Sequence, residues 1–104
     1  MYYAEDRQKA ERVLVELRDA RLNDAAATLA CLHRLRNEVA CHRAGEHLRM
    51  QAWMSIRRLY DVFKVAPERD LKPLWQDAIS KTTVWCESLQ VRASAQVDRF
   101  PGRL

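Results

Sequence analysis

Five residues with chemically active side chains lie between positions 31 and 47: Cys31, His33, Cys41, His42 and His47. Nucleophilic catalysis needs a thiol or hydroxyl held against a base, with donors nearby for an oxyanion. Cys31 and His33 are two residues apart and would point away from each other on a helix, and the adjacent Cys41 and His42 also diverge. The chain has no glycine-rich elbow, so the sequence assigns no catalytic residue and predicts a protein that is not an enzyme.

The same residues do not have the spacing of a metal site. Zinc ligands usually come in pairs such as CxxC or HxxxH, whereas Cys31 and Cys41 would lie on nearly opposite sides of a helix. His42 and His47 are separated by Gly45. We therefore expect no metal and no cofactor. The odd, unclustered set of cysteines predicts free and mostly buried thiols in a reducing compartment.

Basic residues are the next candidates for chemistry. The chain carries a net charge of +4 with a pI near 9.3, and fourteen of its eighteen cationic residues are arginine. The whole surplus falls between residues 25 and 64, where it could steer an acidic partner, either protein or nucleic acid. A GC-rich genome would also favour arginine, and the sequence leaves both explanations open.

These side chains must be positioned by helices, because glycine and proline are scarce and Ala, Leu, Arg and Glu are abundant. The 3.6-residue periodicity predicts helices over residues 4–21, 24–42, 46–65 and 71–99. Either Asn23 or Asp24 is suited to cap the second helix and Asp70 the last, and Gly45 is suited to the left-handed residue that follows a helix. We expect one all-α domain over residues 1–104, an antiparallel four-helix bundle. Three helices with a long, bent first helix are the alternative, since no glycine or proline marks the break near residues 22–24.

Three of the predicted helices have one apolar face each. The first has Ala10, Val13, Leu14, Leu17 and Ala20, the second has Ala25, Leu29, Leu32, Leu35 and Val39, and the last has Leu71, Trp75, Ala78, Thr82, Trp85, Cys86, Leu89 and Ala93. Arg36 falls near the middle of the second stripe. An unpaired guanidinium is costly inside a bundle, so Arg36 must extend to solvent, pair with a carboxylate or face a partner.

The helix over residues 46–65 differs because it has more apolar residues than one face can hold. Its first stripe is Leu48, Ala52, Ile56, Leu59 and Phe63. Met50 and Met54 lie on the opposite side beside Arg57 and Asp61, with Trp53 and Tyr60 at the margin. The helix is therefore either buried on both sides or has a second surface that faces a partner.

The function predicted from this pattern is protein binding, by a small regulator, inhibitor or adaptor of the kind carried by phages and mobile elements. Methionine adapts to varied surfaces, and Trp and Arg are enriched at binding hot spots. The predicted partner-binding residues are Met50, Trp53, Met54, Arg57 and Arg36. The partner would be another protein with acidic character, and self-association into a homodimer is a variant of the same hypothesis.

A nucleic-acid-binding protein is the alternative function. It would use Arg34, Arg43, Arg49 and Arg58 on one contiguous basic face, with an affinity that falls steeply with salt. Membrane binding is not expected, because no apolar run approaches the ~20 residues that a bilayer span needs. The charged start of the chain lacks the apolar region of a secretory signal, which predicts a cytoplasmic protein.

Overall fold

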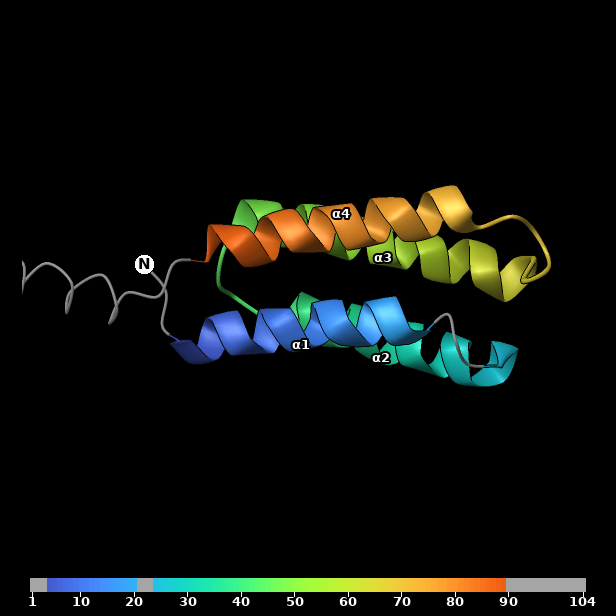
Figure 1. Ribbon diagram of the computed structural model, residues 1–104, viewed down its shortest axis with the longest axis horizontal. Helices are drawn as coiled ribbons and strands as arrows, with labels where there is room; N and C mark the ends of the chain where they lie inside the picture. Colours follow the sequence, from blue (N-terminus) through green and yellow to red (C-terminus); the bar gives the residue numbers. More distant parts are fainter. Residues whose placement is uncertain (1–3, 21–23, 90–104) are drawn as a thin grey trace, which may run out of the picture.

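The computed structural model describes residues 4–20 and 24–89, and this part of the chain consists of four α-helices without strands. They are α1 (Ala4–Ala20), α2 (Ala25–Cys41), α3 (Glu46–Val65) and α4 (Lys72–Ser88). Figure 1 shows consecutive helices running in opposite directions, with α1 and α2 forming one layer and α3 and α4 the other. Each helix packs on two neighbours, most extensively α3 on α4 and α2. The predicted four-helix bundle is confirmed, and the alternative with a long first helix is wrong because α2 reverses direction after α1.

The apolar faces of α1 and α4 are those predicted from helical periodicity. The buried residues of α1 are Ala10, Val13, Leu14, Leu17 and Ala20. Those of α4 are Trp75, Ala78, Thr82, Trp85 and Cys86, flanked by buried Leu71 and Leu89. The predicted extension of α4 to residue 99 is wrong at Leu89, which has left the helix with φ −85° and ψ 90°. Ala93 and the rest of the predicted extension lie outside the described residues.

The start of α2 differs from the prediction. Ala25 is exposed and Leu29 is half-buried, whereas Thr28 is buried in their place. The reason is the junction with α1, because the Thr28 hydroxyl donates to the Ala20 carbonyl at 2.8 Å. That carbonyl belongs to the last turn of α1, which has no helical donor of its own. The predicted cap is confirmed, since the Ala27 amide donates to Asp24 Oδ1 at 2.8 Å.

Gly45 has the predicted left-handed conformation, with φ +64°. Its place differs from the prediction, because α2 already ends at Cys41 and Gly45 is the residue that precedes α3. A Cβ at this position would lie 3.0 Å from the Trp85 ring. The Trp85 indole also donates to the Ala44 carbonyl at 3.0 Å. Glycine is required here both by its backbone angle and by the close approach of α4 to this loop.

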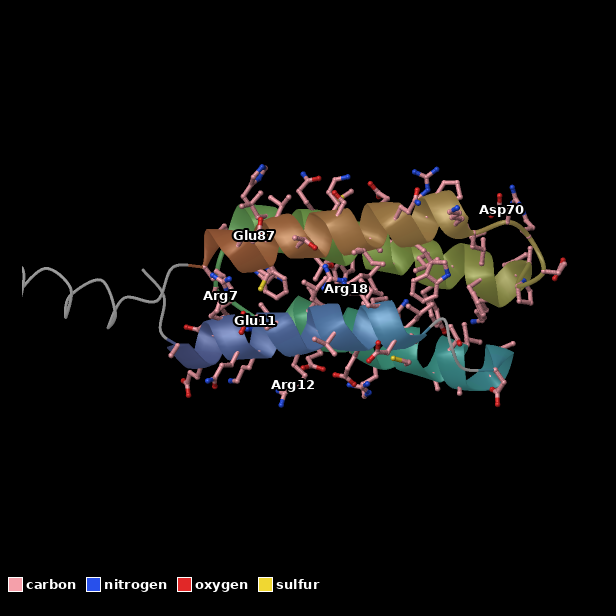
Figure 2. All side chains as sticks on the ribbon, in the orientation of Figure 1. Arg7, Glu11, Arg12, Arg18, Asp70 and Glu87 are labelled. Atoms are coloured by element: carbon pink, nitrogen blue, oxygen red, sulfur yellow. The ribbon has the colours of Figure 1, made fainter. Side chains whose placement is uncertain are left out.

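Two further contacts support the two ends of α4, which lie at opposite ends of the bundle. At one end the Lys72 amide donates to Asp70 Oδ1 at 3.1 Å, so Asp70 supports the start of α4, although Leu71 occupies the cap position. At the other end Arg7 reaches from α1 toward the end of α4 (Figure 2), where it donates to the Leu89 carbonyl at 3.1 Å. Both contacts satisfy backbone groups that a helix end leaves without partners.

Candidate partner-binding surface

The outer face of α3, opposite its buried side, presents apolar side chains to solvent. Ala52, Ile56 and Leu59 are fully buried on the inner side, while Met50 is 41% and Met54 55% exposed. Leu48 and Phe63, from the predicted inner stripe, are half-buried against the core. The second stripe is therefore on the surface of this chain, and α3 is not buried on both sides.

Met54 lies at the junction of two shallow hollows. One has a volume of about 240 Å³ and is lined by Met54, Arg57, Arg58, Asp61 and Val62. The other, of about 190 Å³, continues from Met54 toward α4 and is lined by Gln51, Ser55, Arg58, Asp77 and Lys81. Met54 can therefore contact a ligand seated on α3 alone or across both helices.

Arg57 connects the methionines to the aromatic margin of α3. Its guanidinium carbon lies 5.4 Å from the centre of the Trp53 ring, and the same side chain lines the first hollow with Met54. It also pairs with Asp61 at 3.8 Å, an exposed contact that contributes little to stability. The structure thus brings Trp53, Met54 and Arg57 together, and Met50 lies one turn from Met54 on the same face.

Arg36 leaves the apolar stripe of α2 and extends over the Tyr60 ring of α3. Its guanidinium carbon is 4.7 Å from the centre of the Tyr60 ring, and Nη2 is 3.4 Å from His33 Nδ1. A cation over an aromatic face is stabilised by the ring's quadrupole, which explains how Arg36 is accommodated without entering the core. Sequence reasoning treated His33 only as a possible catalyst or ligand and did not consider Lys64, which lies 5.9 Å from the same ring.

Two of the four arginines in the nucleic-acid hypothesis are engaged within the fold. Arg34 forms ion pairs with Glu16 of α1 and with Glu38, the latter at 3.4 Å. The hydrogen bond to Glu16 raises the Arg34 pKa above its ordinary value.

Arg49 requires a correction to the predicted set. It is only 9% exposed, and its Nη1 donates to the carbonyls of Val39 at 3.1 Å and Ala40 at 3.4 Å. It therefore satisfies the carbonyl end of α2 and does not belong to an exposed basic face. Arg43 and Arg58 are exposed, one in the loop before α3 and the other on α3. The four arginines do not share one face.

The thiols and imidazoles are dispersed. Burial raises the pKa of Cys31 and Cys86, which disfavours their thiolates, whereas Cys41 is exposed and departs from the expectation of mostly buried thiols. Burial also shifts the pKa of His42, in this case downward. The His42 ring lies edge-on to the Trp85 ring, with the two ring centres 5.1 Å apart. Among residues 4–20 and 24–89, no three His, Cys, Asp or Glu side chains are grouped so that they could hold a metal. None of the described helices has the length and apolar character that a membrane span requires.

Comparison with known proteins found no matching family model, no matching curated protein and no matching solved structure. Met50, Trp53, Met54 and Arg57 lie together on α3, whereas Arg36 extends from α2 over Tyr60 beside His33.

Proposed function

We propose that this protein is a small helical module that binds another protein through the outer face of α3, acting as a regulator, inhibitor or adaptor rather than as an enzyme. The observation that carries the proposal is the exposure of Met50 and Met54 on α3, opposite the buried residues Ala52, Ile56 and Leu59. The core is formed without them, so folding alone does not account for two methionines at these positions. Flexible methionine side chains beside Trp and Arg are typical of protein-binding surfaces.

The charges on this face favour a different protein over a second copy of the chain. Arg57 and Arg58 line the same hollow, and Asp61 is its only acidic member. Two such faces pressed together would place arginines against arginines, and like charges across an interface oppose association. An acidic partner would instead gain from the same arrangement. Nucleic acid is less well supported, because Arg34 is paired with glutamates and Arg49 is buried.

Site-specific photocrosslinking in the native cells tests the proposal. A photoreactive phenylalanine analogue replaces Met54 in one variant and Val15 in the control, because Val15 is an equally exposed apolar residue on α1. We expect a discrete adduct with another protein from position 54 and none from position 15. Adding Met50→Glu to the first variant should abolish the adduct, since it places a charge one turn away on the same face.

Three results would count against this function. Equal adducts from both positions would mean that contact is not localised to α3. An adduct with the mass of two copies would identify a homodimer, and an adduct with nucleic acid would favour the alternative function. Met54→Gln serves as the folding control, because a substitution at so exposed a site should change stability by less than about 0.5 kcal/mol.

A further inference from the structure

Three groups that can carry positive charge surround one aromatic ring between α2 and α3. Arg36 and Lys64 lie 4.7 Å and 5.9 Å from the centre of the Tyr60 ring, and the His33 ring centre is 5.6 Å away. We call His33, Arg36, Tyr60 and Lys64 the Tyr60 cluster. Its residues come from both helices, so the packing of α2 on α3 creates it.

No carboxylate balances this cluster within the described part of the chain. Arg36 and Lys64 have no ion-pair partner there, and the acidic residue nearest in sequence, Asp61, pairs with Arg57 at 3.8 Å. Arg34, on the same helix as Arg36, contacts two glutamates. The Tyr60 ring offsets part of the repulsion between the cations, and an anion placed beside them would offset more.

We propose that the Tyr60 cluster binds side-chain carboxylates of an acidic segment in the partner protein. This inference rests on the proposed function, because Tyr60 is three residues along α3 from Arg57, which lines the hollow at Met54. One segment lying along α3 can place apolar side chains over Met50 and Met54 and acidic ones over Arg57, Arg36 and Lys64. Arginine is well suited to this contact, since its planar fork matches a carboxylate with two parallel hydrogen bonds.

A protein carboxylate fits this surface better than a nucleic-acid phosphate. A nucleic-acid backbone needs a track of free cations, but of the four arginines that could form one only Arg43 and Arg58 are exposed and without an ion pair in the described part of the chain, one in the loop before α3 and the other on α3. Arg34 turns toward α1, where it pairs with Glu16, and Arg49 is buried beneath α2. Met50 and Met54, which are exposed on the same helix as Tyr60 and Lys64, suit the mixed surface of an amphipathic peptide.

Peptide titration followed by NMR tests the inference. The probe is an amphipathic helical peptide with leucine on one face and glutamate on the other, compared at low salt with the same peptide carrying glutamine. Arginine Nε–H and histidine ring signals report directly on the cluster. We expect saturable shifts at Arg36 and His33 with the glutamate peptide, and an affinity at least about tenfold weaker for the glutamine peptide.

Matched charge deletions localise the contact. Arg36→Gln and Lys64→Gln should each lower the affinity for the glutamate peptide several-fold. Lys64 is exposed, so its variant retains the fold. Arg18→Gln is the control, because it removes the same charge from the side of α1 that faces α4 (Figure 2). It should leave the affinity unchanged.

Four outcomes would overturn the inference: no saturable shift, equal affinity for both peptides, equal losses from Arg18→Gln and Arg36→Gln, or tighter binding of a single-stranded DNA oligonucleotide to the same residues. A crosslink from position 54 combined with any of these results would leave the proposed function standing and reject only the acidic segment. A glutamate-specific response without that crosslink would leave a carboxylate-binding cluster at Tyr60 but would reject a partner protein docked on the outer face of α3.

Discussion

Helix α2 has two seams with contrasting use of charge. In the α1–α2 seam, Arg12 pairs with Glu38 and Arg34 with Glu16 across the two helices, and Arg34 also pairs with Glu38 within α2. In the α2–α3 seam, Arg36 and Lys64 face an aromatic ring and have no acidic partner among residues 4–20 and 24–89. Arg34 and Arg36 are only two positions apart, but residues at that spacing point about 160° away from each other on a helix. Arg34 is thus engaged in one seam, whereas Arg36 is available for a ligand in the other.

The difference shows that net charge alone does not locate a binding surface. The arginines of the α1–α2 seam contribute to the positive total, but their charge is compensated locally by glutamates. Arg36 at the α2–α3 seam and the arginines on the outer face of α3 are the ones an acidic partner could meet. Comparing a variant of a paired or buried arginine with a variant of an exposed, unpaired one therefore tests this contrast.

The largest expected effect is at Arg49, the buried arginine between α2 and α3. Arg49→Ala should lower the free energy of unfolding by about 2–3 kcal/mol, because it leaves the carbonyls of Val39 and Ala40 without their charged donor. Urea denaturation measures the loss. Arg58→Ala, an exposed deletion on the same helix, should cost less than about 0.5 kcal/mol. Equal costs would mean that burial does not distinguish these two arginines.

Added salt should lower the peptide affinity much more than it changes the stability of the fold. Raising the ionic strength to about 0.5 M shortens the Debye length below ~8 Å and should weaken the glutamate peptide by about tenfold. The urea midpoint should hardly move, because each exposed pair of the α1–α2 seam contributes less than about 1 kcal/mol. Parallel titration and unfolding series at several salt concentrations provide the comparison. Peptide affinity that does not depend on salt would contradict a carboxylate contact.

The smallest expected effect compares the two arginines of α2 directly. Arg34→Gln should cost about 0.5–1 kcal/mol of stability, since it breaks contacts with both Glu16 and Glu38 on a partly exposed surface. Arg36→Gln should cost less, because it removes only a cation–ring contact and a neighbouring imidazole contact. For peptide affinity the order should reverse, with Arg36→Gln the more damaging change. Thermal unfolding and the NMR titration together check this crossover.

Much of the fold could be predicted because helical periodicity is a local property. The inner face of α1, from Ala10 to Ala20, follows directly from the spacing of its apolar residues. The misses lie where one element meets another. Thr28 lies in the core where Leu29 was expected, because its hydroxyl caps α1. Gly45 precedes α3 and does not end α2, in the loop that Trp85 approaches closely. Neither contact has a signature in the neighbouring sequence.

The candidate surface was predicted in part for the same reason. The second stripe of α3, with Met50 and Met54, follows from counting positions around one helix. The partners of Arg36 and Arg49 depend on which helix lies beside them, and the Tyr60 cluster exists only because α2 packs on α3.

The sequence by itself therefore determined the helices, most of their inward faces and the excess of apolar residues on α3, because each depends on residues within a few turns of one another. Only the tertiary structure decided which cations pair, which are buried and which remain on the surface. Ion pairing and desolvation depend on neighbours that are distant in the chain, as Glu16 is from Arg34 and Tyr60 is from Arg36.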